Sequence, residues 1–411
     1  MSRMYWTNFL HIYQPPTQTP EILGRVTNEC YRPLVAILLR YPHARITLNI
    51  NGCLTEQLVR DGYRDVIDGL RELAARGQIE FTASAKYHPI LPLIPEEEAI
   101  RQIELNTEVN RRYLGTVYRP QGFFSPEMCY SRTVAEMVHR LGYRWIIVDE
   151  LSYCGKLGTV RYDRLYRIRG LQDFYVFFRE RFTSAGITYG SLPAGESLLR
   201  RLGAAIGQKR YLLTGTDGEI YGHHRRGQEQ LLIDIFASGA LDLCRLTDLF
   251  ALFQEKEEVD PLPCSWSTWE DELVAAIPYP QWAYPGHGLH DTQWALTRLA
   301  IEALASADRS APGYEAARQY LDEGLHSCQY WWASCRPWWD TGMIERGAAL
   351  LKQVVDAIKS QLSPELVCRA AFLEEQIRKT ARTWQESGKA RILRRQYLET
   401  HPGVSSLLTF G

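Results

Sequence analysis

The sequence lacks the features of a secreted, membrane-spanning or zinc–thiolate protein. Its nine cysteines are an odd number and include no Cys-x-x-Cys pair, so neither a disulfide framework nor a thiolate zinc site is predicted. There is no run of about 18 apolar residues, and the N-terminus has no apolar signal-peptide core. We therefore expect a cytoplasmic protein that is not associated with a membrane.

The sequence also lacks an excess of charge of either sign. Lys and Arg number 47 against 48 Asp and Glu, a net charge of −1, so nucleic acid is not an expected partner. The 411 residues, 45% of them hydrophobic, suffice for one large domain or two ordinary ones, and the oligomeric state is unknown. Aromatic residues are plentiful, with 11 Trp and 23 Tyr, and such rings stack on sugars as well as filling cores.

Short apolar runs alternate with amphipathic segments in the first 290 residues. Strands are predicted at residues 4–12, 45–50, 77–82, 121–124, 143–148 and 211–213, with a further pair at 162–169 and 173–178. Helices are predicted at residues 31–41, 54–76 with a break near Asp61-Gly62, 95–113, 131–141, 191–207, 228–237 and 241–256. Such alternation predicts a parallel sheet covered by helices.

The pattern changes towards the C-terminus. Residues 261–290 form a long irregular stretch rich in Trp and Pro, which we interpret as a functional loop. Only helices are predicted after it, at residues 292–307, 314–332, 342–360 and 363–388. We therefore expect a catalytic α/β domain with inserted loops at 1–290 and a helical region at 291–411 that packs on it.

Ionisable or polar side chains follow the ends of the predicted strands: His11, Gln14, Glu80, Glu127, Asp149, Glu150, Asp217 and Glu219. Because the carboxyl ends of parallel strands share one edge, these groups are expected to meet there. Several carboxylates among many aromatic residues favour glycoside chemistry, which uses two carboxylates.

A metal site is the competing interpretation of the same residues. The candidate ligands are His11, Asp217, Glu219, His223 and His224. They would serve a metal-dependent polysaccharide deacetylase or a mannosidase-like hydrolase. We favour the two-carboxylate interpretation because adjacent histidines rarely face one metal ion.

Five short motifs occur in order along the chain. They are His11-Ile-Tyr13-Gln14-Pro15, Gly77-Gln78-Ile79-Glu80, Phe124-Ser125-Pro126-Glu127, Asp217-Gly218-Glu219-Ile220-Tyr221-Gly222 and Ser327-Cys-Gln-Tyr330-Trp331-Trp332. Together they resemble the motifs of glycoside hydrolase family 57. Tyr13 departs from the family pattern, which usually has a second His there. A phenol does not take the positive charge that an imidazole can carry, so we expect a difference in substrate preference or subsite detail.

The resemblance implies a distorted TIM-like (β/α)7 barrel with a C-terminal helical region, acting on α-glucans by a retaining mechanism without a metal or other cofactor. It implies Glu127 as the nucleophile and Asp217 as the acid/base. The predicted substrate-binding residues are His11, Tyr13, Gln14, Glu80, His88, Glu219, His223, Trp269, Trp331 and Trp332. Hydrolysis as in α-amylases, 4-α-glucanotransfer (transglycosylation) and branching remain open, with α-1,4 or α-1,6 linkages as the targets. A non-catalytic glucan-binding protein is a further alternative.

Overall fold

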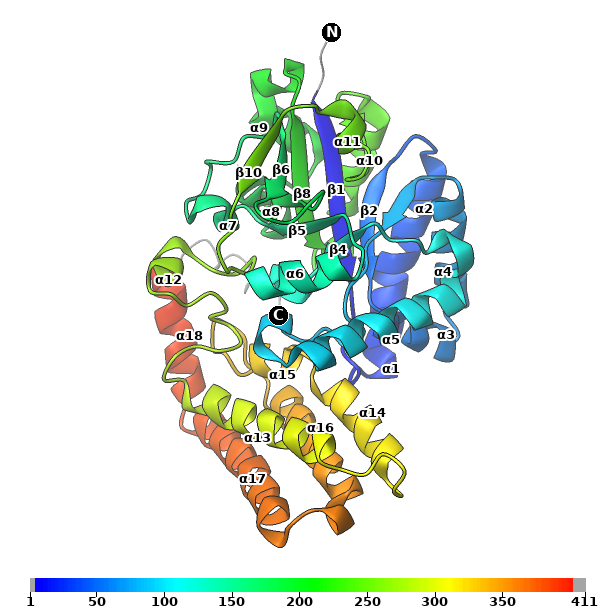
Figure 1. Cartoon of the computed structure of the whole chain (residues 1–411). Helices are drawn as coiled ribbons and strands as arrows, with labels where there is room; N and C mark the ends of the chain where they lie inside the picture. The colour runs from blue at the N-terminus through cyan, green and yellow to red at the C-terminus, as the bar shows by residue number, and fades with distance from the viewer. Residues whose placement is uncertain (1–3, 402–411) are drawn as a thin grey trace. The chain divides into compact units, whose positions relative to one another are not determined.

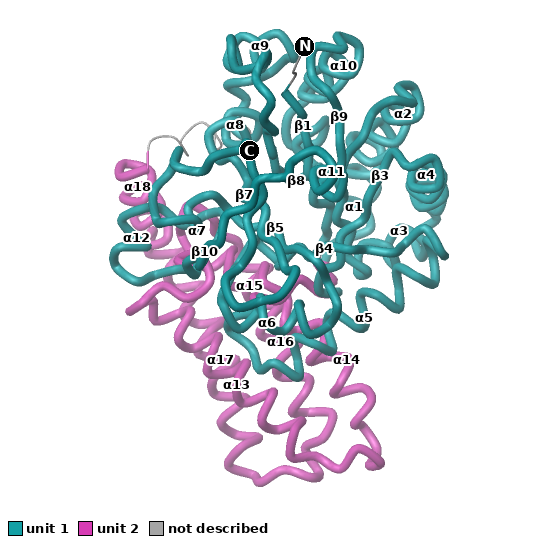
Figure 2. Tube along the Cα trace, turned by 45° about the horizontal axis from the view of Figure 1, so that its top comes forward, with its two compact units in different colours: residues 1–14, 18–86, 91–278 teal, residues 15–17, 87–90, 279–411 magenta. Residues whose placement is uncertain are grey.

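The computed structural model describes residues 4–401, which form two compact units (Figure 2). Within this range, unit 1 comprises residues 4–14, 18–86 and 91–278, and unit 2 comprises 15–17, 87–90 and 279–401. Two short segments from the first part of the chain thus group with the C-terminal helices. The last part of the predicted helical region, 402–411, lies outside the described residues.

Unit 1 contains the ten strands of the described chain (Figure 1). They are β1 Tyr5–Ile12, β2 Ile46–Ile50, β3 Ile79–Phe81, β4 Gly122–Phe124, β5 Trp145–Asp149, β6 Leu165–Ile168, β7 Tyr175–Arg179, β8 Tyr211–Asp217, β9 Asp242–Leu243 and β10 Lys256–Val259. The strands predicted from the sequence correspond to β1–β8. The order of the strands decides which of their ends meet.

The strands form two sheets, β3-β2-β1-β8 with β9 on β1, and β10-β6-β7-β5-β4. Pairing is parallel except between β6 and β7. A parallel bridge between Ala83 and Phe123 joins the end of β3 to β4. The Glu180 amide donates to the Leu213 carbonyl at 2.8 Å and joins β7 to β8. Strands β1, β2, β3, β4, β5, β7 and β8 thus follow one another as in a (β/α)7 barrel with interrupted ladders, which confirms the predicted fold class.

Alternation along β1 separates its two faces. Trp6, Leu10 and Ile12 pack into one apolar core with the flanking helices, whereas Phe9 belongs to a second core shared with β4, β5 and β7. Because successive side chains in a strand point to opposite faces, His11 shares the face of Phe9. The strand therefore anchors the outer helices with one face and presents His11 on the other.

Twelve helices belong to unit 1. They are α1 Pro20–Val26, α2 Arg32–Arg40, α3 Gly52–Arg60, α4 Arg64–Ala75, α5 Glu96–Leu114, α6 Arg132–Arg140, α7 Leu151–Cys154, α8 Arg181–Thr188, α9 Gly195–Leu202, α10 Glu229–Ser238, α11 Leu249–Leu252 and α12 Glu270–Val274. The helix predicted at 241–256 was wrong, because this segment divides into β9, α11 and β10. Its apolar spacing resembles a helix, but β9 pairs with β1 and β10 with β6, so tertiary pairing overrides the local pattern.

Unit 2 is helical, as predicted for the C-terminal part of the chain. Its helices are α13 Gly288–Ala305, α14 Tyr314–Gly324, α15 Cys328–Trp331, α16 Thr341–Ala357, α17 Pro364–Glu386 and α18 Lys389–Thr400. The single helix predicted at 314–332 is divided into α14 and α15, and α18 was not predicted. Within this unit, Tyr330 stacks on Trp294 with 4.3 Å between ring centroids and contacts Thr297 Oγ1 through its hydroxyl at 2.5 Å.

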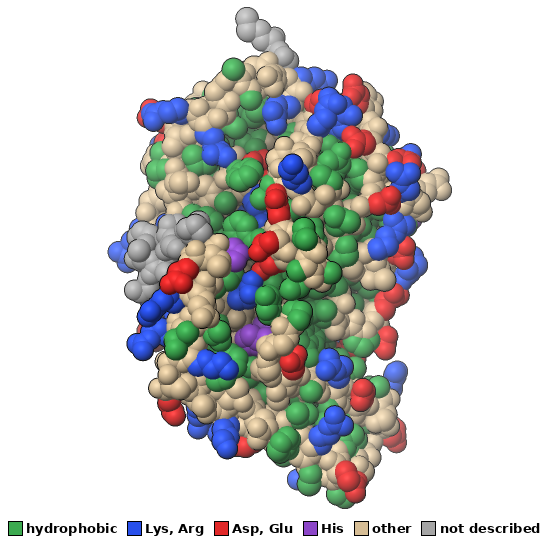
Figure 3. Space-filling model, turned by 90° about the vertical axis from the view of Figure 1, so that its left-hand side faces the viewer, with side chains coloured by type: hydrophobic (Ala, Val, Ile, Leu, Met, Phe, Trp, Pro, Cys, Tyr) green, Lys and Arg blue, Asp and Glu red, His purple; other side chains and the backbone are tan. Residues whose placement is uncertain are grey.

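The surface agrees with the balanced composition. Acidic and basic side chains are interspersed over the face drawn in Figure 3, as expected from a net charge of −1. All nine cysteines are free thiols. A search of residues 4–401 finds no helix with the length and apolarity needed to cross a membrane.

Candidate active site

Register places three polar side chains side by side on neighbouring strands. His11 of β1 lies opposite Asn49 of β2 and opposite Asp217 of β8. Residues opposite each other in a sheet project to the same face, so these three groups share the face that includes Phe9. The predicted meeting of His11 and Asp217 at the carboxyl ends of their strands is thereby explained by parallel pairing.

Glu127 reaches the site from a strained turn. The short strand β4 leads into a single 3-10 turn at Pro126–Met128, in which φ is 59° for Glu127 and 50° for Met128. Positive φ in non-glycine residues costs of the order of 1 kcal/mol or more and is concentrated at functional sites. The turn is held by Ser125, whose Oγ donates to the Cys129 carbonyl at 2.7 Å. Strain here is an independent indication that the position of Glu127 matters.

Trp266 connects Glu127 with the strand ends. Its Nε1 donates to Glu127 Oε2 at 2.8 Å, and its backbone N–H donates to the Glu127 carbonyl at 3.2 Å. The indole lies against His11 and Phe124, with ring centroids 6.2 Å and 5.9 Å away. A single side chain from the loop 261–269 therefore orients the carboxylate and packs against β1.

The two carboxyl groups influence each other. Burial raises the pKa of Glu127 to about 8, and the nearby charge of Asp217 adds to this shift, opposed by the Trp266 hydrogen bond. Burial raises the pKa of Asp217 to about 6, opposed by the positive charge of Arg179. Two interacting acids share their titration steps. At neutral pH the pair therefore favours a state with one carboxylate and one carboxylic acid.

His11 is a neutral hydrogen-bonding group. Its Nδ1 is 2.8 Å from Asn49 Oδ1, and with an oxygen as acceptor this nitrogen carries the proton. Burial lowers the pKa of His11 to about 4, with the Asn49 bond opposing. The ring therefore adds no positive charge beside Asp217 near neutral pH.

Glu219 holds the segment after β1. Its Oε1 accepts from the Tyr31 hydroxyl at 2.5 Å, the Tyr13 amide at 3.2 Å and Gln14 Nε2 at 3.5 Å. Burial raises the pKa of Glu219 to about 8, and the charge of Asp217 adds to this shift. The Tyr13 ring stacks on His11 with 6.1 Å between centroids. Four of the predicted site residues near Asp217 are thus linked by contacts: His11, Tyr13, Gln14 and Glu219.

Glu80 and His223 have other partners. The Glu80 carboxylate accepts from the Thr247 amide at 3.1 Å and from the Thr247 hydroxyl, and its register with Thr47 and Phe9 puts it one layer below His11. His223 Nδ1 contacts Glu29 Oε2 at 2.6 Å. We therefore leave both out of the sugar-binding set proposed below.

The remaining predicted binding residues lie in two places. Trp269 belongs to unit 1, where its ring faces the Arg181 guanidinium at 5.7 Å. His88, Trp331 and Trp332 belong to unit 2. There His88 Nδ1 contacts Ser327 Oγ at 3.0 Å, and Trp331 meets Trp332 edge to face at 4.9 Å. Their roles in sugar binding stay predictions.

Sequence reasoning did not single out four residues of this site: Asn49, Trp266, Arg179 and Tyr31. Asn49 and Arg179 stand at or near strand ends, which was the signal used for the others. Trp266 lies in the aromatic loop that the sequence did mark as functional. Tyr31 had no signal, because its contact with Glu219 spans 188 positions in the sequence.

The candidate metal ligands do not form a metal-binding group in the described part of the chain. Among residues 4–401, no three His, Cys, Asp or Glu side chains are arranged to hold a metal ion. The metal-dependent alternative is therefore addressed by experiment below.

Carboxyl groups at the carboxyl ends of parallel strands are the usual placement of functional groups in α/β barrel enzymes. The family model of glycosyl hydrolase family 57 matches residues 4–257, more than half of the chain. The chain therefore belongs to glycosyl hydrolase family 57.

Individual relatives match shorter stretches. An α-amylase of Pyrococcus horikoshii is 29% identical over 153 residues, which is 37% of this chain and 24% of that protein. A 4-α-glucanotransferase of Thermococcus litoralis is 28% identical over 153 residues, which is 37% of this chain and 23% of that protein. The matched stretch thus spans about a quarter of the length of these curated relatives.

Solved structures agree in fold over most of the chain. The 4-α-glucanotransferase of Thermococcus litoralis has a TM-score of 0.69 at 17% identity, covering 89% of this chain and 61% of that one. A branching enzyme of Thermococcus kodakaraensis has a TM-score of 0.63 at 16% identity, covering 92% and 95%. At such identities the likeness establishes the fold alone.

Proposed function

We propose that the protein is an α-glucan-active enzyme that works by a retaining, two-carboxylate mechanism. The observation that carries the proposal is the coupled pair Glu127 and Asp217, one held by Trp266 and the other at the end of β8. Membership of glycosyl hydrolase family 57 and the names of the relatives, α-amylase, 4-α-glucanotransferase and branching enzyme, support α-glucans as the substrate class.

In the first step, Glu127 attacks the anomeric carbon while Asp217 protonates the leaving glycosidic oxygen, which forms a covalent glycosyl-enzyme. In the second step, Asp217 takes a proton from water or from an acceptor hydroxyl, which displaces Glu127. The chemistry needs Glu127 ionised and Asp217 protonated, whereas a pKa of about 8 for Glu127 and a pKa of about 6 for Asp217 leave the shared proton of the free pair mainly on Glu127 at neutral pH. The proposed mechanism therefore requires that this proton pass to Asp217 when the substrate is bound. The indole N–H of Trp266 stabilises the ionised form of Glu127.

The sugar-binding residues that we propose in unit 1 are His11, Tyr13, Gln14, Glu219 and Trp269. Neutral His11 offers Nε2 as an acceptor to a sugar hydroxyl, since Nδ1 is used by Asn49. Glu219 acts by holding the backbone of Tyr13 and the Gln14 amide. The roles of His88, which is buried, and of the partly buried Trp331 and Trp332 are left to tests by substitution.

The first experiment is incubation of the purified protein with amylose and with maltoheptaose, followed by chromatography of the products. Short products alone indicate hydrolysis, longer linear chains indicate transfer, and new α-1,6 branch points indicate branching. Loss of turnover with a chelator, and its return with a divalent ion, would support the metal-dependent alternative. Glucan binding without turnover would support a non-catalytic binding protein.

The roles of the two carboxylates are separated by azide with a 4-nitrophenyl α-maltooligoside. In Glu127→Gly, azide takes the place of the missing nucleophile and gives a β-configured glycosyl azide. In Asp217→Asn, azide attacks the glycosyl-enzyme and gives the α-configured product. The reverse pattern would exchange the two assigned roles.

A further inference from the structure

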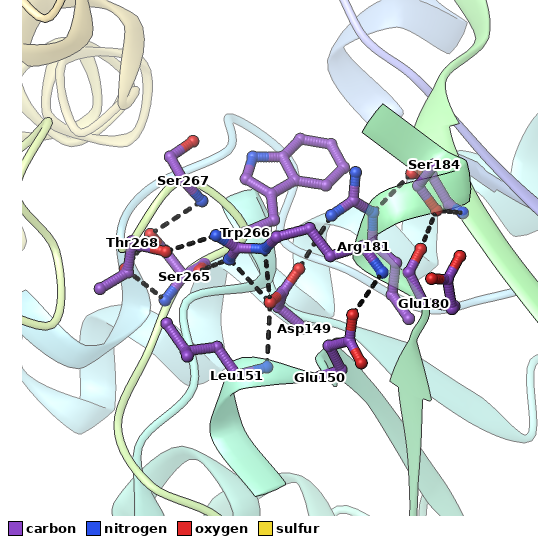
Figure 4. A network of polar contacts seen from close by, with 12 residues as sticks. Asp149, Glu150, Leu151, Glu180, Arg181, Ser184, Ser265, Trp266, Ser267 and Thr268 are labelled. Carbon is purple, nitrogen blue, oxygen red and sulfur yellow. Dashed lines mark hydrogen bonds and ion pairs between the residues drawn. The ribbon is translucent and has the colours of Figure 1, made fainter. Parts of the chain in front are cut away.

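A buried ionic triad lies next to the proposed carboxylate pair. Asp149, at the end of β5, is fully buried. Its Oδ2 accepts from Arg179 Nη1 at 2.8 Å. Its Oδ1 accepts from Arg181 Nη2 at 2.7 Å and from the Leu151 amide at 3.1 Å (Figure 4). One carboxylate between two guanidinium groups leaves a net charge of +1 in the interior. Such a charge is costly unless other buried groups offset it.

Arg179 contacts the structures that carry both carboxylates. Its Nε donates to the Gly215 carbonyl at 2.7 Å, two residues before Asp217 on β8. Its guanidinium carbon is 5.7 Å from the centroid of the Trp266 ring, the ring whose N–H binds Glu127. The close approach to β8 favours a glycine, because a Cβ on Gly215 would lie 3.2 Å from Arg179 Cδ and one of the two groups would have to shift.

Arg181 holds the turn that carries Trp266. Its Nη1 donates to the Thr268 carbonyl at 2.5 Å and its Nη2 to the Ser265 carbonyl at 3.4 Å, so the two contacts stand on either side of Trp266 (Figure 4). The Ser265 and Thr268 hydroxyls, 2.7 Å apart, close the same turn. The indole that binds Glu127 is therefore positioned by Arg181, whose own ion pair is with Asp149.

We propose that Asp149, Arg179 and Arg181 are positioning residues that set the protonation of the Glu127–Asp217 pair. The triad supplies the charge of +1 that offsets the single negative charge of the working pair, and Arg181 fixes the indole that binds Glu127. The catalytic role of the triad rests on the function proposed above. The electrostatic effect itself belongs to the resting protein and is measurable without substrate.

Other titratable groups face the same region. Around the pair they are His11, Cys129 and Glu219, and around the triad they are Glu150, Tyr162, Tyr189 and Cys264. His11 is neutral because burial lowers its pKa to about 4. Burial raises the pKa of the Tyr189 phenol and of the Cys129 thiol. Glu219 is the remaining acid beside Asp217, so it is kept unchanged in every variant below.

The test is the pH profile of kcat/KM, which reports the free enzyme. In Arg179→Met the loss of a positive charge moves the bell-shaped profile to higher pH by about one unit. In Asp149→Asn the loss of a negative charge moves it to lower pH. The control Arg179→Lys keeps the charge, so its profile falls in height but keeps its position. A triad with only a structural role would lower activity without these opposite shifts.

A second readout makes the test independent of turnover. Trp266 fluorescence is followed against pH, and the part of the signal that Trp266→Phe and Glu127→Gln both abolish reports ionisation of Glu127. We expect its midpoint to rise in Arg179→Met, to fall in Asp149→Asn and to stay near the wild-type value in the double variant. The double variant also keeps the net charge of the triad at +1, so it avoids the change in buried charge that could unfold either single variant.

The outcomes separate the two proposals. Opposite shifts of the fluorescence midpoint without α-glucan turnover would reject the proposed function and keep the electrostatic role of the triad. Turnover with identical midpoints in Arg179→Met, Asp149→Asn and the wild type would keep the function and overturn the inference.

Discussion

The two carboxylates are carried by segments of opposite character. Asp217 is the last residue of β8, a strand of seven residues that pairs with β1 along its whole length. Glu127 follows β4, a strand of three residues, on a turn with positive φ. Regular ladder bonds position the first carboxylate, and a few individual contacts position the second.

This difference has a consequence for robustness. A ladder distributes its stabilising energy over many backbone groups, so a single substitution removes little of it. The turn at Glu127 depends on the Ser125 hydroxyl, on the Trp266 indole and on the backbone bond from Trp266. We therefore expect the geometry of Glu127 to be the more fragile of the two.

The largest expected effect comes from the carboxylates themselves. Glu127→Gln removes the nucleophile, and we expect kcat/KM on maltoheptaose to fall by about 10⁴-fold or more. The reason is that the glycosyl-enzyme is formed on the carboxylate oxygen of Glu127. Asp217→Asn removes an acid/base catalyst, which is worth about 10²–10⁴-fold. Steady-state kinetics of the two variants measure the difference.

A substrate with a good leaving group sharpens that comparison. A 4-nitrophenyl glycoside needs little protonation, so it should restore the first step in Asp217→Asn and not in Glu127→Gln. Equal recovery in both variants would contradict the assigned roles.

The next effect concerns the indole at Glu127. Trp266→Phe keeps a ring but removes a hydrogen bond to an ionised group, worth about 1.5–3 kcal/mol. We expect kcat/KM to fall about 10- to 100-fold. The matched control is Trp6→Phe, which removes the bond from a buried indole to Thr214 Oγ1 at 2.8 Å. The control should lower stability and leave the pH profile in place; a similar profile shift in both variants would argue against a specific role of Trp266.

The difference between the strand that carries Asp217 and the turn that carries Glu127 also decides what could be predicted from the sequence. Asp217 and His11 were predictable together, because apolar runs mark β1 and β8 and parallel pairing brings their ends to one edge. The motif with Glu127 was also visible, but the positive φ that aims it was not, since no glycine marks the turn.

The contacts that tune the site were beyond the sequence. Trp266 binds a carboxylate 139 positions away, and Arg179 binds Asp149 30 positions away, in each case through tertiary packing. The segment 241–256 shows the same limit in the fold, because its helix-like spacing is used by β9 and β10 in different sheets.

A smaller effect tests how closely Arg179 approaches the ladder. In Gly215→Ala, the new Cβ would stand 3.2 Å from Arg179 Cδ and 3.2 Å from Met128 Cε. Overpacking of this kind costs about 1–3 kcal/mol, so the melting temperature should fall by several degrees. The control is Gly207→Ala, where a Cβ meets nothing within 4 Å. Equal melting temperatures for both variants would show that Arg179 is not confined between β8 and Met128.

The smallest effect is on stability against pH. Burial raises the pKa of Glu127 to about 8, above the value of about 4.3 in an unfolded chain. The folded state therefore holds this proton more tightly, and the resulting stability is complete below about pH 4 and is lost as the pH rises towards 8. Glu127→Gln removes the penalty of a buried charge, so it should melt a few degrees above the wild type at pH 8.5 and level with it at pH 4.

The control is Glu104→Gln, on the exposed face of α5, which should match the wild type at both pH values. A melting temperature of Glu127→Gln below that of the wild type at pH 8.5 would contradict this expectation. It would mean that the hydrogen bond from Trp266 stabilises the ionised Glu127 by more than burial destabilises it.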